Sequence, residues 1–188
     1  LYAPAVDAAL ANGGNPGVFA AQLDALYQTS AGAAAGLLLM GENARYLLGE
    51  DIYGRLRTMR RMDDRGDQGG GWVDFKSGRS TQNGKCVDGD NRLSGVHLGV
   101  DARPSDGPSR VGGSFAYYTG RNSTYGVSGG ADNYFVNGYA QHVVPDSGWF
   151  GNLWAGYGRN NYTNGATGHG DSYIVDAGIG RRFFVSQA

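Results

Sequence analysis

The chain has 188 residues and a formal net charge of −1, which excludes the basic surface of a nucleic-acid-binding protein and a strongly acidic tail. Glycine is over-represented: it makes up 34 of the 188 residues, about 18 %, against an average usage of about 7 %. The glycines follow no three-residue period, so a collagen-like structure is excluded. The aromatic content of 12 % argues against disorder. Glycine-rich, aromatic strands of this kind occur in soluble β-sandwiches and in outer-membrane barrels.

The N-terminal third is predicted to be a helical linker that covers residues 1–62. The sequence Asn12-Gly13-Gly14 is a helix-stop signal, and Asn15-Pro16 supplies an N-cap with proline at the first helical position. The longest apolar run, 31–40, is too short for a membrane-spanning helix of ~20 residues. If the chain crosses a membrane, it is therefore expected to cross with strands.

The last part of this linker, 42–62, is predicted to be the longest helix. Acidic residues occur early in it and arginines late, which complements the helix dipole. One interpretation is an amphipathic helix packed on a soluble domain with its arginines in water. The other is a helix inside a polar tube, with its arginines facing carboxylates on the wall. In the second interpretation the pore-helix residues are Arg55, Arg57, Arg60 and Arg61.

A polar, glycine-rich hinge at 63–71 is predicted to separate this helix from a strand region at 72–188. Six segments in that region alternate apolar and polar residues, which is the period of a β-strand. The sixth shows it most clearly, because Val175 and Ile179 fall on one face while Asp176 and Arg182 fall on the other. The predicted strands are 71–79, 93–103, 110–121, 132–144, 149–160 and 172–183.

The two faces of these strands differ in character. The apolar face is expected to meet lipid, and its candidates are Val96, Leu98, Val100, Leu153, Tyr157, Val175 and Ile179. The opposite face is expected to line a pore, and its candidates are Asp74, Lys76, His97, Asp101, Arg103, Asp176 and Arg182. Several glycines share the second face, where they would leave room for a helix to pass.

The connections between the strands are predicted to alternate in length. Long polar loops are expected at 80–92, 122–131 and 161–171, and short proline-bearing turns at 104–109 and 145–148. Short turns on one side and long loops on the other are typical of an outer-membrane barrel. The fold predicted from these patterns is mainly β, an antiparallel transmembrane barrel preceded by an α-helical segment.

At this point the chain resembles the C-terminal translocator β-domain of autotransporters, the type V secretion proteins. The matching residues are the arginine-bearing helix and its polar hinge, followed by the loose strand motifs 71–73, 95–101, 112–118, 137–140 and 152–157. The resemblance implies a twelve-stranded barrel in the Gram-negative outer membrane, with a helix in its pore and a passenger exported in cis to the cell surface. It also implies that the barrel assembly machinery and periplasmic chaperones are partners.

The chain departs from that pattern in strand number and at its last residues. About six strands are found where the family has twelve, and the sequence 183–188 has no C-terminal aromatic residue. Six strands could not close around a helix, since even eight leave room only for side chains. The sequence is therefore expected to represent the first half of a translocator barrel.

No catalytic, metal or cofactor site is predicted. The segment 170–173 is similar to the nucleophile block of some esterases, but it lies at a loop-to-strand junction without a matching Asp-x-x-His. The three histidines have no metal-ligand spacing. The alternative to a translocator is a soluble all-β adhesion module with a helical stalk, and a hydrolase is a third possibility.

Overall fold

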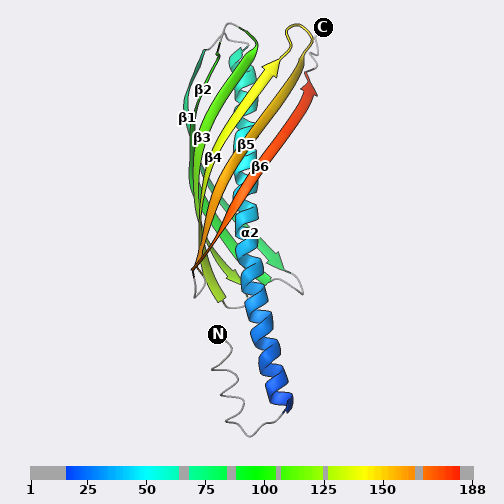
Figure 1. Ribbon diagram of the computed structural model, residues 1–188, viewed down its shortest axis with the longest axis vertical. Helices are drawn as coiled ribbons and strands as arrows, with labels where there is room; N and C mark the ends of the chain where they lie inside the picture. Colours follow the sequence, from blue (N-terminus) through cyan, green and yellow to red (C-terminus); the bar gives the residue numbers. More distant parts are fainter. Residues whose placement is uncertain are drawn as a thin grey trace.

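The computed structural model describes residues 16–63, 68–83, 88–104, 107–124, 127–163 and 167–182. It contains a long helix, α2 (Pro16–Asp63), followed by strands joined in chain order into one antiparallel sheet. The sheet curves around the C-terminal part of the helix and leaves β1 and β6 as its edges (Figure 1). The strands are β1 (Gly69–Asn83), β2 (Asp88–Ala102), β3 (Ser109–Thr124), β4 (Val127–Val143), β5 (Trp149–Thr163) and β6 (Thr167–Arg181). The prediction of a mainly β fold with six antiparallel strands is confirmed.

The helix is longer than the sequence predicted. The expected helix began at residue 42, whereas α2 is continuous from Pro16 to Asp63. Alanine has the highest helix propensity, so the alanine-rich segment before residue 42 continues the helix instead of interrupting it. The N-terminal part of α2 projects beyond the sheet, and the C-terminal part lies in its concave side (Figure 1). Within the described residues, no helix combines the length and hydrophobicity that a membrane crossing requires.

The predicted alternation of loop lengths is wrong. The strands extend into the expected long loops, so that only positions 84–87, 125–126 and 164–166 lie between them at that end of the sheet. The opposite connections, 103–108 and 144–148, are the longer ones. Serine, threonine, asparagine and glycine at the strand ends resemble loop composition, but backbone pairing continues through them because the ladder does not depend on side-chain polarity.

Two further boundaries differ from the prediction. Strand β1 begins at Gly69, inside the predicted hinge, and β6 ends at Arg181, two positions before the predicted end. The hinge positions 64–67, the helix-stop signal at 12–14 and residues 183–188 lie outside the described residues.

Glycines on the inner face of the sheet stand directly opposite aromatic residues of neighbouring strands. The cross-strand pairs are Trp72 with Gly99, Tyr139 with Gly112, Phe135 with Gly158 and Phe150 with Gly180. In each pair, a Cβ added to the glycine would overlap the aromatic ring. The glycines therefore make space for rings that lie flat along the wall, which keeps the interior wide enough for α2.

Gly158→Val is expected to lower the free energy of unfolding of the full-length protein by about 1–3 kcal/mol, the usual effect of overpacking. The added side chain would meet the Phe135 ring and the backbone oxygen of Tyr134. Gly138→Val on the outer face is the matched control, because a Cβ there meets nothing within 4 Å. Thermal unfolding followed by circular dichroism measures both. Equal effects of the two substitutions would contradict the assigned role of the inner glycines.

The interior contains one hydrophobic core, formed between the helix and the wall. One stripe of α2 is fully buried and consists of Met40, Ala44, Leu48, Ile52, Leu56 and Met59. It packs against inward residues of the sheet that include Leu93, Ala116, Tyr118, Phe135, Tyr139 and Trp154. The three- and four-residue spacing of the stripe places all its members on one side of the helix.

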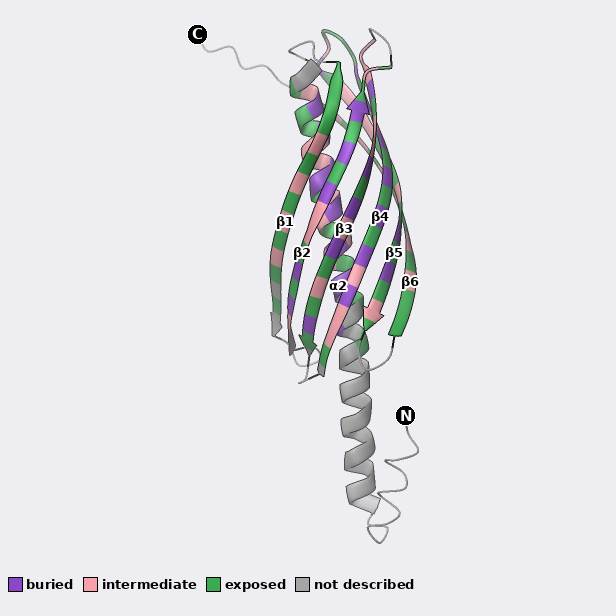
Figure 2. Cartoon of the chain, turned by 90° about the vertical axis from the view of Figure 1, so that its left-hand side faces the viewer, coloured by how far each residue is buried: buried purple, intermediate pink, exposed green. Residues whose placement is uncertain are grey.

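The outer face of the sheet is apolar and exposed. The strands alternate exposed and covered residues along their length (Figure 2). Val175 and Ile179 of β6 are 77 % and 81 % exposed, and Phe75 of β1 is 76 % exposed. A continuous face of exposed apolar side chains is unusual for a protein surface in contact with water.

Candidate functional site at the helix–wall interface

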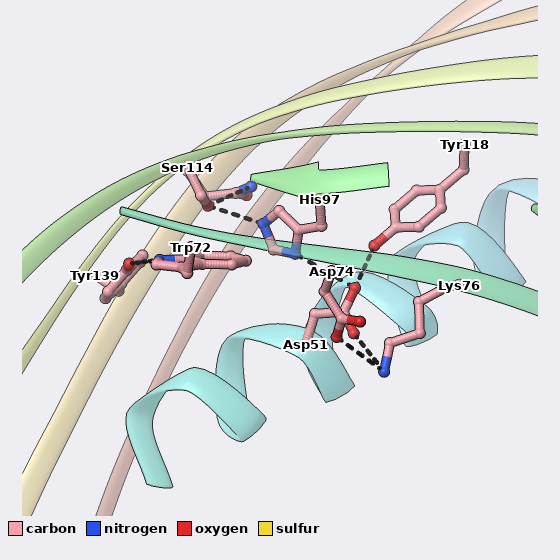
Figure 3. A network of polar contacts seen from close by, with 9 residues as sticks. Asp51, Trp72, Asp74, Lys76, His97, Ser114, Tyr118 and Tyr139 are labelled. Carbon is pink, nitrogen blue, oxygen red and sulfur yellow. Dashed lines mark hydrogen bonds and ion pairs between the residues drawn. The ribbon is translucent and has the colours of Figure 1, made fainter. Parts of the chain in front are cut away.

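Asp51 of α2 is the centre of a buried polar cluster (Figure 3). Its side chain contacts three strands, because Lys76 of β1, His97 of β2 and Tyr118 of β3 all converge on the carboxylate. Lys76 Nζ lies 2.9 Å from Oδ1, the Tyr118 hydroxyl donates to Oδ2 at 2.7 Å, and His97 Nδ1 lies 3.3 Å from Oδ2. Asp51 is 5 % exposed, so these groups replace the water that a carboxylate would otherwise bind.

A second layer of contacts fixes the partners of Asp51. His97 Nε2 lies 2.9 Å from Ser114 Oγ on β3, and the imidazole meets the Trp72 ring edge-on at 4.7 Å. Trp72 Nε1 in turn donates to the Tyr139 hydroxyl at 2.9 Å (Figure 3). Lys76 Nζ also forms an ion pair with Asp74, whose Oδ2 lies 3.2 Å away. The network therefore runs from the helix across four strands of the wall.

Arg55 lies one turn after Asp51 and forms the second charged contact with the wall. Its Nε donates to Asp101 Oδ2 of β2 at 2.6 Å, and its guanidinium lies 5.7 Å from the centre of the Trp72 ring. Asp101 is 5 % exposed. The pair is thus largely withdrawn from water, where removing one partner leaves an uncompensated charge.

The remaining contacts attach the helix to the other side of the wall. The Tyr53 hydroxyl donates to Asp176 of β6. Gln141 Nε2 of β4 donates to the backbone oxygen of Leu56 at 3.1 Å, and the Arg60 guanidinium lies 4.1 Å from the centre of the Phe150 ring. Side chains from all six strands therefore meet the helix or its direct partners.

The predicted pore-helix arginines occupy different environments. Arg55 meets a wall carboxylate and Arg60 covers an aromatic ring, whereas Arg57 and Arg61 are exposed. Arg57 follows Leu56 of the buried stripe by one position and Arg61 follows Met59 by two, and at 100° per residue this places both arginines on another side of the helix. The expectation that all four arginines face wall carboxylates is therefore corrected for Arg57, Arg60 and Arg61.

The predicted wall residues all lie on the inner side of the sheet or at its ends. Asp74, Lys76, His97, Asp101 and Asp176 belong to the contacts above. Arg103 and Arg182 follow the last residues of β2 and β6, where their backbone N–H groups donate to Gln68 and Gly148. Asp74 meets Lys76 and Asp176 meets Tyr53, whereas wall carboxylates were predicted to face the helix arginines.

Four residues of the site were not predicted from the sequence, namely Asp51, Tyr53, Tyr118 and Ser114. The signal for Asp51 was present, since it stands three residues after Leu48 and four before Arg55, which places the three residues on one side of the helix. Its acidic character was interpreted only as complementing the helix dipole. Tyr118 and Ser114 carried no signal beyond their inward position in the alternation of β3.

Asp51, His97 and Ser114 form a carboxylate–imidazole–hydroxyl chain, and all three side chains are buried between the helix and the wall. Ser172, from the segment similar to an esterase block, accepts a hydrogen bond from Asn160 at 2.8 Å, and Asp171 accepts one from Tyr157. Among the described residues, no three His, Cys, Asp or Glu side chains cluster in a way that could hold a metal ion.

A family model, described as the autotransporter beta-domain, matches residues 66–187. The chain belongs to this family. Autotransporter β-domains are translocators built as β-barrels in the Gram-negative outer membrane, and as a family they are not enzymes. A similar solved structure is the beta domain of the Bordetella autotransporter BrkA, at 24 % identity and a TM-score of 0.47. The match covers 63 % of this chain and 51 % of that one, so the chain spans about half the length of the solved domain. Comparison with curated proteins gives no match.

Proposed function

We propose that this autotransporter chain exports a passenger in cis to the cell surface and anchors it there, with α2 as the plug of its pore. The course of α2 supports this proposal. The helix passes along the inside of the sheet, joins β1 at one end and projects beyond the sheet at the other (Figure 1). A passenger attached before α2 would therefore leave along the interior of the barrel.

The observation that supports α2 as a plug is the combination of its buried stripe with the charged contacts of Asp51 and Arg55. Apolar packing alone would allow α2 to slide or rotate along the wall, whereas two buried charges opposite fixed partners specify one position. Hydrogen bonds to charged groups contribute about 1.5–3 kcal/mol each. Contacts from several strands therefore favour a helix that stays in the pore.

The wall residues would line the pore, and the outer face would meet the lipid of the outer membrane. The proposed lipid-facing residues Leu98, Val100, Leu153, Tyr157, Val175 and Ile179 are exposed, and Val96 of the same face is partly covered. This face argues against the soluble adhesion module, because such a module would present the same apolar side chains to water. Family membership also supports the barrel assembly machinery and periplasmic chaperones as partners.

Surface display of a reporter tests the export function. A protease-sensitive reporter placed before residue 1 of the full-length protein is expected to be cleaved by protease added to intact Gram-negative cells. Periplasmic maltose-binding protein in the same cells is the control for an intact envelope. A reporter that stays protected until the envelope is permeabilised, while the barrel is folded in the outer membrane, would contradict the proposal.

A further inference from the structure

Three arginines form a row across the outer face of β1, β2 and β3. Arg79 pairs with Arg92 in the register of β1 and β2, and Arg92 pairs with Arg121 in the register of β2 and β3. All three are exposed, whereas the flanking residues Asn91, Leu93 and Asn122 are buried on the helix side. Neighbouring strands lie about 4.8 Å apart, and like charges placed directly opposite destabilise a sheet. The row therefore gains stability when an anion binds to it.

From the arginine row toward the middle of the sheet, the outward-facing residues change from charged to apolar in regular steps. The next outward positions toward the middle of the sheet carry hydroxyl groups, on Ser77, Ser94 and Thr119. The following ones are Phe75, Val96 and Tyr117, and then Val73, Leu98 and Phe115. Each step is two residues, or about 7 Å along a strand. The arginines thus stand just beyond the edge of the apolar band.

Charged residues on the other strands lie one and two steps nearer the middle of the sheet than the arginine row. Asp132 of β4 stands opposite Thr119, in the hydroxyl step, and Arg159 and Asp171 pair with each other one step below it. A charged side chain that faces the middle of a bilayer costs up to about 2–4 kcal/mol, and the cost falls toward the interface. These residues therefore place the end of the hydrocarbon region below the arginine row, which puts the row at the level of lipid headgroups.

Among the side chains that the structure describes, the charges of the row are only partly compensated. Asp90 accepts two hydrogen bonds from Arg79 at 2.9 Å and lies 3.5 Å from Arg92. One carboxylate therefore serves two guanidinium groups. No ion pair of Arg121 is found among the described residues. Guanidinium groups bind phosphate through two parallel hydrogen bonds, and the nearby hydroxyl groups are further donors.

We propose that the row of Arg79, Arg92 and Arg121 binds the phosphate groups of phosphorylated lipids in the leaflet at the end of the sheet where positions 84–87 and 125–126 lie. This inference rests on the proposed function, because it requires the outer face to be in a membrane. Bound headgroups would hold β1 to β3 at a fixed height in that leaflet.

Lipid binding by the purified full-length protein in detergent micelles tests the proposal. The probe is lipid A with two phosphate groups, compared with the same lipid after enzymatic removal of its phosphates, and native mass spectrometry measures the bound fraction. The wild-type protein is expected to bind the phosphorylated lipid at least tenfold more tightly. The variant R79Q/R92Q/R121Q is expected to lose this preference, whereas the control R45Q/R57Q/R61Q, which loses three arginines of α2, keeps it.

Three results would overturn the proposal: equal binding by the row variant and the wild type, an equal loss in the control variant, and displacement of lipid A by millimolar inorganic phosphate. The last would show that the row recognises free phosphate. Circular dichroism establishes that each variant is folded before binding is measured. Reporter display is measured separately on the wild type, so a translocator without lipid preference is distinguished from a protein that does not export.

Discussion

Asp51→Lys is expected to increase the single-channel conductance of the full-length protein in planar lipid bilayers several-fold. The new lysine would face Lys76 and His97 in a buried site and would leave the Tyr118 hydroxyl without its acceptor. Breaking a buried charge pair by removing one partner costs about 3–5 kcal/mol. A loss of that size displaces α2 from the wall, and ions then pass through the space that the helix vacates.

Glu50→Lys is the matched control for this prediction. It makes the same charge change at the neighbouring residue, but Glu50 is exposed and has no wall partner in the contacts of the buried cluster. Its conductance is expected to stay close to that of the wild type. Similar conductance of the two variants would show that Asp51 does not hold the helix in place.

Exchanging the charges of Arg55 and Asp101 is expected to restore most of the stability that either single change removes. Arg55→Glu places two carboxylates together at a site where Asp101 is almost fully covered, and Asp101→Arg places two guanidinium groups there. Each single variant is expected to lose about 3 kcal/mol or more. The double variant R55E/D101R recovers the attraction, so it should lose clearly less stability than either single variant, and the double-mutant cycle should be strongly non-additive.

Thermal unfolding in micelles measures the cycle, and Arg57→Glu is its control. Arg57 is exposed on the same helix, so its reversal should change the stability by no more than about 0.5 kcal/mol. Additive effects of R55E and D101R would contradict a direct contact between the two side chains in the full-length protein.

The sheet could be predicted from the sequence because its alternation is a local property. Tyr173, Val175, Ala177 and Ile179 occupy one face of β6 in the structure as they do in the pattern. The strand ends could not be predicted in this way. Thr81 and Asp90 lie in the predicted loop 80–92, yet they pair in the ladder, because strand pairing depends on backbone groups of another segment.

The partners in the interior could be predicted only in part, because they depend on three-dimensional register. Arg55 and Asp101 were each assigned to the pore interior from local patterns, and the structure brings them into contact. Asp51 was missed, since its partners come from three strands whose heights relative to α2 are set by the sheet register. The exposed Arg57 shows the converse, because an arginine in a polar helix has no local feature that distinguishes a buried contact from a solvated one.

Conductance of the full-length protein with and without residues 42–62 tests most directly whether α2 plugs the pore. The wild-type protein in planar bilayers is expected to show small or no steady conductance, and the deletion variant is expected to show large, stable open channels. Circular dichroism of the reconstituted deletion variant confirms that its barrel is folded. Equal conductance of the two proteins, with both barrels folded, would contradict the account of α2 as a helix held in the pore by Asp51 and Arg55.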